Sequence, residues 1–179
     1  MADLVSMGEL LIDFTPWGDG GRKAPLCPQS RGRPANVAVQ AHRAGVSAGF
    51  LGRVGLDMFG GFLADTLKGC GVDTRGLSQD PDYATTLAFV QLSPEGDRDF
   101  SFYRNPGADT RLSFAETDLS IVEECKLLCF GSLLLTAEPP AARCTSWWTM
   151  PARWGRSPPM TPTGGRPCGR AGRKRASSA

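Results

Sequence analysis

Several residue patterns on which catalytic sites commonly depend are missing from this sequence. His42 is the only histidine, so a histidine-rich metal site is not available. The six cysteines include no CxxC pair, and the four-residue spacing of Cys125 and Cys129 is more typical of packed thiols than of metal ligands. No run of 18 or more apolar residues occurs, so the sequence predicts no membrane-spanning helix.

The N-terminus also lacks the features of a secretory signal. The opening segment MADLVSMGELLIDF carries an aspartate where a signal would carry lysine or arginine, and it has no small-residue cleavage site. We therefore expect a cytoplasmic protein with no membrane partner. At 179 residues, 41% hydrophobic and 21% charged, the composition is that of an ordinary soluble globular chain that can bury a core.

Acidic residues are absent from the last part of the chain. From Pro139 onward there are eight Lys or Arg and no carboxylate, and this stretch also holds three of the four Trp. A basic arm for nucleic acid is one interpretation, but the segment has no helical period and its Trp are not spaced as a stacking platform. Because it is rich in Pro, Gly and Arg without an apolar period, we predict that residues 141–179 are disordered and bind no nucleic acid.

The remaining chain alternates strand and helix patterns. Residues 3–16 form an apolar run typical of a buried parallel strand, and residues 33–46 predict a helix that Gly45 ends. A second strand over 47–55 precedes a second helix, which begins near Asp57 and carries Phe59, Phe62, Leu63 and Leu67 on one face. This order predicts an α/β layer fold.

A β-hairpin is predicted to interrupt that alternation. Residues 84–104 alternate apolar and polar side chains on both sides of the turn sequence Ser-Pro-Glu-Gly at 93–96. The segment 120–135 then reads as the end of a helix that runs into another strand. The layer fold would thus carry one small β-excursion.

Polar side chains stand where such folds bind ligands, at the carboxyl ends of strands. Asp13 follows the first strand, Asn36 opens the first helix, and Arg104 leaves the hairpin. Carboxylate, amide and guanidinium groups together can hydrogen-bond a polyol from several sides. Two simpler roles remain open: Asp57 caps the second helix, and Asn36 occupies a first turn for propensity alone. No GxGxxG or GxxxxGK[ST] loop is present, so any nucleotide site is unorthodox or lies elsewhere.

Six segments keep the order and spacing of a known family. The chain resembles the PfkB (ribokinase-like) carbohydrate kinases, nearest to bacterial fructokinases, over about residues 4–140. The segments are GELLIDF, PANVAVQAHRAG, LGRVGLDMFG, GVDT, FSFYRNPGAD and FGSLLLTAEP. The resemblance implies a ribokinase-like αβα layer fold, truncated, in which residues 1–140 form the N-terminal part of a sugar kinase domain. Segments 14–34 and 84–105 would build a small β-lid.

The resemblance also assigns roles to particular residues. Asp13 would hold sugar hydroxyls, Gly32 and Asn36 would line the sugar site, and Arg104 would reach in from the lid. The family uses ATP and Mg²⁺, and it takes its catalytic aspartate from a GAGD-type motif in a C-terminal half. This chain ends before such a motif, so we expect no catalytic, cofactor-binding or metal-binding residue in it and no activity.

Two departures from the family pattern point to shifts of reading frame. Arg31 and Arg33 flank Gly32 where the signature has glycine and alanine, and the resemblance ends near residue 140. Trp and Met have one codon each, so they restrict what the gene can encode in another frame. Read two bases late, the codons of the tail are compatible with the segment that follows in the family. We interpret the tail as the wrong frame of a GC-rich gene.

Three hypotheses follow for function. The first is a fructokinase-like kinase of a hexose, with ribokinase and 2-keto-3-deoxygluconate kinase as related alternatives. The second is a sugar- or nucleoside-binding fragment without catalysis. The third is an interaction protein that forms a homodimer through unpaired lid strands.

Overall fold

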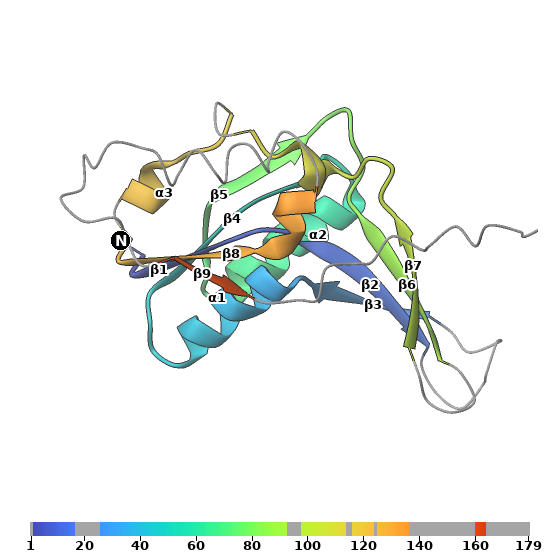
Figure 1. Cartoon of the computed structure of the whole chain (residues 1–179), viewed down its shortest axis with the longest axis horizontal. Helices are drawn as coiled ribbons and strands as arrows, with labels where there is room; N and C mark the ends of the chain where they lie inside the picture. The colour runs from blue at the N-terminus through green and yellow to red at the C-terminus, as the bar shows by residue number, and fades with distance from the viewer. Residues whose placement is uncertain are drawn as a thin grey trace, which may run out of the picture.

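The computed structural model describes residues 2–16, 26–92, 98–113, 116–123, 125–136 and 160–163. These residues form a five-stranded sheet in the order β5-β4-β1-β8-β9 and a four-stranded sheet in the order β3-β2-β6-β7 (Figure 1). The elements in chain order are β1 Leu4–Met7, β2 Leu11–Pro16, β3 Leu26–Arg31, α1 Arg33–Arg43, β4 Ala48–Gly55, α2 Met58–Gly69, β5 Asp73–Asp80, β6 Leu87–Leu92, β7 Arg98–Tyr103, the 3₁₀ turn η2 Ala108–Arg111, α3 Ser120–Glu123, β8 Leu127–Gly131, the 3₁₀ turn η3 Ser132–Thr136 and β9 Met160–Thr163.

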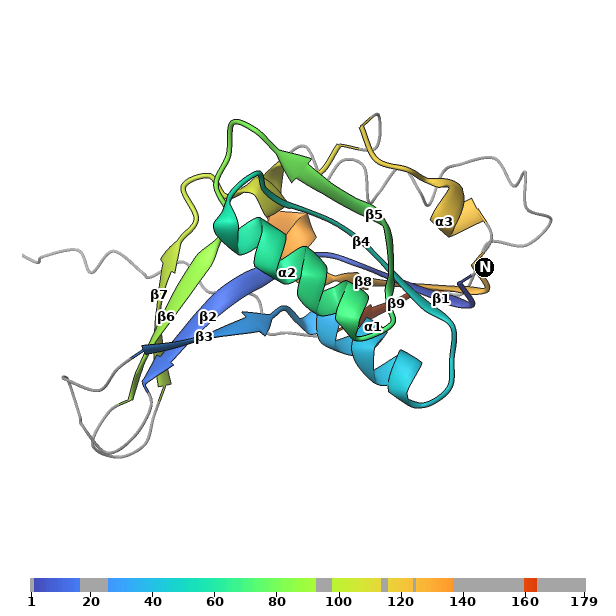
Figure 2. The same cartoon turned by 180° about the vertical axis from the view of Figure 1, so that it is seen from behind.

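The five-stranded sheet is parallel and covered on both faces. Its described pairs, β1 with β4 and β8, β4 with β5, and β8 with β9, all run parallel. Helices α1 and α2 lie on one side of it, and α3 lies on the other side with the chain that leads into it (Figures 1 and 2). Every residue of β4 is consequently buried, as expected for a strand between two covered faces.

Each face of the five-stranded sheet packs against its own hydrophobic cluster. Phe50 of β4 packs in the cluster that α1 and α2 cover, whereas its neighbour Leu51 packs in the cluster beneath α3. Successive residues of a strand point to opposite faces, so one strand serves both clusters. This arrangement confirms the predicted αβα layer fold.

The two predicted helices are present and their ends follow from sequence. Pro34 lies in the first turn of α1, and His42 and Arg43 lie in its last turn, where cations favour the helix dipole. Gly45 follows with φ 86°, a left-handed conformation that glycine adopts without strain. In α2 the buried face carries Leu63 and Leu67. The placement of Phe62 on that face is wrong, since its side chain is 46% exposed.

The single strand predicted over residues 3–16 is divided between the two sheets. β1 ends at Met7, and β2 begins at Leu11 in the four-stranded sheet. Gly8 lies at the division, where a β-carbon would approach within 2.3 Å of Pro34 Cγ in α1. The apolar run in the sequence does not reveal this break, because apolar residues continue on both sides of Gly8. Strand β5 was also missed, since its sequence DTRGLSQD is mostly polar.

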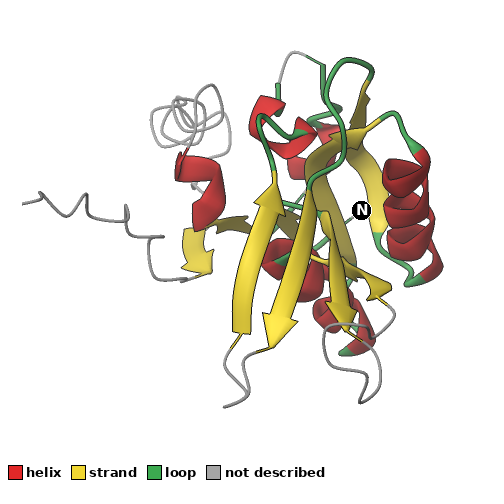
Figure 3. Cartoon of the chain, turned by 90° about the vertical axis from the view of Figure 1, so that its right-hand side faces the viewer, coloured by secondary structure: helices red, strands yellow, loops and turns green. Residues whose placement is uncertain are grey.

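The four-stranded sheet, called the lid below, projects beyond one end of the layered core. Figure 3 views the molecule from that end. β2 pairs antiparallel with β3 and parallel with β6, and β6 pairs antiparallel with β7 as the predicted hairpin. Its turn at 93–96 lies outside the described residues.

Aromatic side chains join the lid to the core. Phe14 of β2 stacks on Phe89 of β6 at 4.8 Å between ring centroids and meets Phe59 of α2 edge-on at 5.9 Å. Such ring pairs add about 0.5–1.5 kcal/mol beyond the area that they bury. The lid is therefore held against α2 by the edge-on contact of Phe14 with Phe59 as well as by its continuous chain.

Two further predictions concern parts of the chain that the structure describes only partly. Of residues 139–179 it describes Met160–Thr163, which form β9 beside β8, and the other residues of the tail lie outside the described set. Disorder or a shifted frame in the tail thus stays a prediction. Within the described residues, no helix is long and apolar enough to cross a membrane.

Candidate functional site

Asp13 lies inside the lid strand β2, at the junction with the core, rather than after the first strand. Its side chain is 14% exposed, and Arg31 of the neighbouring strand β3 places Nε 3.8 Å from Asp13 Oδ2. Arg31 is one of the two arginines that depart from the family signature. The departure therefore sets a guanidinium against the carboxylate that the resemblance assigns to the sugar.

Glu9 is a second acidic residue at this junction, and sequence reasoning missed it. Its side chain is buried, and Oε1 accepts a hydrogen bond from the backbone N–H of Arg33, 3.3 Å away at the first residue of α1. The N-cap residue Gly32 has no side chain to satisfy that amide, so Glu9 supplies the cap from 24 residues earlier in the chain. Burial raises the pKa of the Glu9 carboxyl above its ordinary value.

Glycines let the backbone close around this carboxyl. Gly32 has φ 144°, and a β-carbon there would lie 2.3 Å from the carbonyl oxygen of Glu9. A β-carbon on Gly131, at the end of β8, would lie 2.7 Å from Glu9 Oε2. Within the described residues Oε2 has no hydrogen-bond partner. Gly32 is thus required for the close approach of two backbone segments at the site.

Asn36 lies one turn inside α1. The helix begins at Arg33, and the backbone N–H of Asn36 donates to the Gly32 carbonyl oxygen at 2.9 Å. Asn36 is thus the fourth residue of the helix and does not open it, and its backbone amide already has a helical partner. Its side chain is exposed and remains available to a ligand.

Arg104 follows β7, and a buried carboxylate holds it. Arg104 Nε and Nη2 lie 2.9 and 2.6 Å from Asp109 Oδ2, and Thr86 Oγ1 donates to Asp109 Oδ1 at 2.7 Å. The Asp109 side chain is only 1% exposed, against 16% for Arg104. The carbonyl of Thr86 also accepts from Ile12 N–H at 3.1 Å, which joins this pair to the strand that carries Asp13.

Asp109 was missed although it lies within the quoted segment FSFYRNPGAD. The available signal was a carboxylate five residues after an arginine, on the 3₁₀ turn η2. Sequence separation alone does not show that the two side chains meet. Asp109 and Arg104 are also close enough to influence the pKa of Glu9 in opposite directions, the first raising and the second lowering it, after the larger effect of burial. The charges of Arg104 and Asp109 therefore act on the Glu9 carboxyl.

Asp57, the remaining candidate, is a capping residue. Its Oδ1 accepts from Gly60 N–H and from Thr85 Oγ1, each at 2.8 Å, and its Oδ2 accepts from Thr85 N–H at 2.8 Å. Burial acts to raise the pKa of Asp57, but these hydrogen bonds together hold it below its ordinary value. Both oxygens are used, which supports the capping role over a ligand role.

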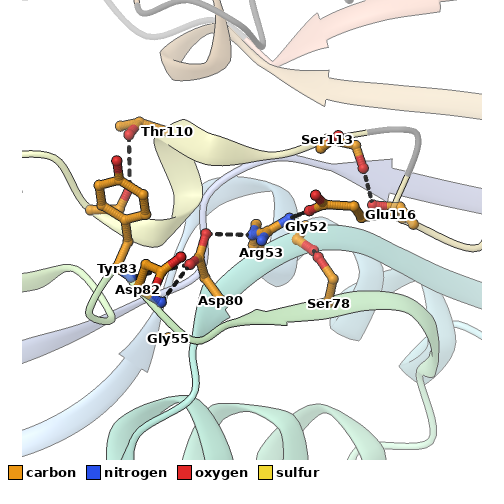
Figure 4. Close-up of polar contacts among 12 residues, drawn as sticks. Gly52, Arg53, Gly55, Ser78, Asp80, Asp82, Tyr83, Thr110, Ser113 and Glu116 are labelled. Atoms are coloured by element: carbon orange, nitrogen blue, oxygen red, sulfur yellow. Dashed lines mark hydrogen bonds and ion pairs between the residues drawn. The ribbon is translucent and has the colours of Figure 1, made fainter.

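A second buried ion pair anchors the segment that carries Asp109. Arg53 of β4 donates from Nε to Asp80 Oδ2 at 2.7 Å and from Nη1 to Glu116 (Figure 4). Asp80 Oδ1 in turn accepts from the backbone amides of Asp82 and Tyr83 at 2.9 and 3.1 Å. η2 packs on β4 and β5. The network therefore holds together the two strands that contact η2.

The described residues offer no metal site. No group of three or more His, Cys, Asp or Glu side chains among them could hold a metal ion. No glycine-rich phosphate loop occurs in the sequence either. Neither Mg²⁺ nor the phosphates of a nucleotide therefore has a fitted set of ligands in this part of the chain.

The fold is that of an α/β protein with a layered core and a β-lid. Its candidate ligand groups are the carboxylate of Asp13, the guanidinium of Arg104, and the N-terminus of α1 with the exposed amide of Asn36. Comparison with known proteins assigns the family. The model of the pfkB family carbohydrate kinases matches residues 1–148, and the chain belongs to this family.

Individual relatives agree with this assignment. The probable chloroplastic fructokinase-6 of Arabidopsis thaliana is 44% identical over 144 residues, which cover 76% of this chain and 36% of that protein. A fructokinase of Xylella fastidiosa with bound ATP superposes with a TM-score of 0.73 at 32% identity, covering 84% of this chain and 45% of that one. A fructokinase of Vibrio cholerae O395 with bound fructose, ADP and calcium gives 0.68 at 30% identity, covering 82% and 46%. The chain thus spans less than half the length of these relatives.

Proposed function

We propose that this chain carries the sugar-binding part of a fructokinase-like, ATP-dependent carbohydrate kinase. The observation that supports it most directly is the set of contacts at the junction of core and lid. Ile12, next to Asp13, donates its N–H to the carbonyl of Thr86, and the hydroxyl of Thr86 donates to the Asp109 carboxylate that holds Arg104. These groups come from segments far apart in the sequence. The relatives with bound fructose and ATP support the choice of a hexose as acceptor and ATP as donor.

Each group has a distinct task in this proposal. Asp13, partly exposed, accepts hydrogen bonds from sugar hydroxyls. Arg104 donates to a ring or hydroxyl oxygen from the lid side. Gly32 brings backbone close to the sugar, and the Asn36 amide donates and accepts at the rim. A neutral polyol presents several hydroxyls, so several such groups are needed to orient one of them for transfer.

Phosphoryl transfer requires groups that the described residues do not supply. A general base for the attacking hydroxyl contributes about 10²–10⁴ in rate, and preorganised donors for the phosphoryl oxygens contribute a comparable factor. Asp13 is engaged with hydroxyls in this proposal and is not positioned as that base. We accordingly expect binding of sugar without its phosphorylation.

The test combines a binding and a turnover measurement on the purified chain. We expect D-fructose to shift amide resonances of residues 8–13 and 32–36 in a ¹⁵N-labelled sample. An ADP-release assay with ATP, Mg²⁺ and fructose, ribose or 2-keto-3-deoxygluconate should give no turnover. Turnover of about 1 s⁻¹, the low end of typical enzymes, would contradict the expected inactivity. Absence of any fructose-induced shift would contradict the sugar site.

We also propose a homodimer through the lid, on a separate observation. β7 is an edge strand of the lid, and it carries three exposed aromatic side chains: Phe100, Phe102 and Tyr103. Exposed apolar edge strands favour pairing with another strand. Sedimentation velocity at rising protein concentration should show a dimer, and Phe102→Glu should shift it to monomer. A monomer at all concentrations would contradict this proposal.

A further inference from the structure

Arg104 is the cation that enters the candidate site from the lid, but its charge is already matched. Two of its three guanidinium nitrogens, Nε and Nη2, are bound to Asp109, at 2.9 and 2.6 Å from Oδ2. Among the described residues Nη1 makes no such contact. The guanidinium can therefore still donate hydrogen bonds to a ligand, but it does so as half of an ion pair.

The partner carboxylate is unusually well fixed. Asp109 is 1% exposed, its Oδ1 accepts from Thr86 at 2.7 Å and lies 3.2 Å from Arg104 Nε. Gly107 permits this geometry, because a β-carbon on it would lie 2.0 Å from Thr86 Oγ1 and 2.8 Å from Asp109 Oδ1. Removing one member of such a buried pair leaves an uncompensated charge, so the two are held together in the folded state.

The other charges of the site follow the same pattern. Arg31 lies 3.8 Å from Asp13, which makes a second, more exposed pair. Glu9 adds a buried acidic group and no cation. Arg33, at the start of α1, is exposed, so water and salt screen its charge. The part of the site enclosed by protein thus has no cation in excess of its carboxylates.

We propose that Asp109 selects the charge of the ligand: by neutralising Arg104 it makes the site accept an uncharged polyol and reject a sugar acid. The inference rests on the proposed function, because it names the substrate class of that same site. A hydroxyl oxygen needs only a donor, which Arg104 Nη1 supplies. A ligand carboxylate would need the guanidinium charge, for which it competes with a preformed bidentate partner, and it would meet Asp13 and Glu9 as like charges.

Asp109→Asn tests the selection directly. Asparagine keeps the shape and an oxygen acceptor but removes the charge, so Arg104 becomes an uncompensated cation facing the site. Asp73→Asn is the matched control, since it removes the same charge from an Arg–Asp pair on β5, where Arg75 Nη2 lies 2.8 Å from Asp73 Oδ2. The probes are D-fructose and D-gluconate, a neutral and an anionic six-carbon polyol, titrated at fixed ionic strength into the purified 179-residue chain.

We expect the unsubstituted chain and Asp73→Asn to bind fructose at least tenfold more tightly than gluconate. In Asp109→Asn the ratio of the two dissociation constants should move toward gluconate by at least tenfold, and added salt should reverse part of that change. Equal binding of both probes by the unsubstituted chain would overturn the proposal. So would an unchanged ratio in a folded Asp109→Asn protein.

A second readout separates this inference from the proposed function. The Arg104 Nε–H resonance of a ¹⁵N-labelled sample reports on the guanidinium whether or not fructose binds. If fructose binds to neither protein, the proposed sugar site fails, but a gluconate-induced shift of that resonance confined to Asp109→Asn still supports charge selection. A shift of equal size in the unsubstituted chain overturns it. If Asp109→Asn does not fold, the response of the unsubstituted chain to the two probes decides.

Discussion

The layered core and the lid bury their strands to very different extents. All eight residues of β4 in the core are buried, whereas β3 of the lid has no buried residue and β7 exposes Phe100, Phe102 and Tyr103. The core is a parallel sheet covered on both faces, and the lid is a mostly antiparallel sheet with exposed edges. Burial therefore stabilises the core, while the lid depends on strand pairing and a few side-chain contacts.

The candidate site takes residues from both regions. Asp13 and Arg104 belong to the lid or its end, whereas Gly32 and Glu9 are tied to α1. Two kinds of contact connect the regions: Phe14 of β2 with Phe59 of α2, and Arg104 after β7 with Asp109 of η2, which packs on β4. The rigid core can thus hold lid side chains in place although the lid has little core of its own.

The largest expected effect is the loss of a core side chain. Phe50 is completely buried between β4 and the helices. Phe50→Ala should lower the free energy of unfolding by about 3–5 kcal/mol, because it removes apolar contacts and leaves a cavity. Phe102→Ala in the lid should change it by less than about 0.5 kcal/mol, since that ring is exposed. Urea unfolding followed by circular dichroism measures both, and equal losses would contradict the contrast drawn between the regions.

A smaller effect is expected at the glycine that joins core and lid. Gly32→Ala forces a β-carbon toward the Glu9 carbonyl at φ 144°, which we expect to cost about 1–3 kcal/mol. Gly61→Ala is the control, because Gly61 lies in α2 with open space around it. There alanine should stabilise the helix by up to about 1 kcal/mol. Thermal unfolding of both variants checks the prediction, and a Gly32→Ala protein as stable as the original would refute it.

Glu9 makes the stability of the junction depend on pH. Its pKa in the folded protein is raised by burial, so the folded state holds a proton that the unfolded chain releases near 4.5. The contribution of Glu9 is then most favourable below that pH, and it declines as the pH rises through the raised folded value. Glu9→Gln keeps a polar side chain without this titration. Its stability relative to the original chain should increase across that window, and a constant difference from pH 4 to 8 would contradict the assignment.

The smallest effect on stability is expected at the lid surface. Arg31 is 47% exposed and lies 3.8 Å from Asp13, so the pair contributes less than about 1 kcal/mol. Arg31→Gly should therefore leave the unfolding midpoint nearly unchanged. It removes the positive charge beside the Asp13 carboxylate, however, and fructose should bind severalfold more tightly. A titration by NMR compares the two proteins, and weaker binding in the variant would show that Arg31 assists the ligand instead.

Local sequence patterns sufficed for elements whose residues specify them without help from afar. The strand β4, the two helices and the hairpin β6–β7 were all predicted, because apolar periodicity, capping and turn residues lie within each segment. β5 has little apolar pattern and pairs only because β4 lies beside it. The break at Gly8 likewise depends on α1 packing against the chain there.

The site likewise combines features predicted from local sequence with contacts between distant parts of the chain. The sequence indicated a carboxylate and a guanidinium, Asp13 and Arg104, as candidate ligands, and the family resemblance assigned them a sugar. Folding places Asp13 inside β2, pairs Arg104 with Asp109 and brings Glu9 to the first residue of α1. Hydrogen bonds and ion pairs act over about 3 Å between atoms, and folding alone brings residues such as Glu9 and Arg33, 24 positions apart in the chain, to that distance.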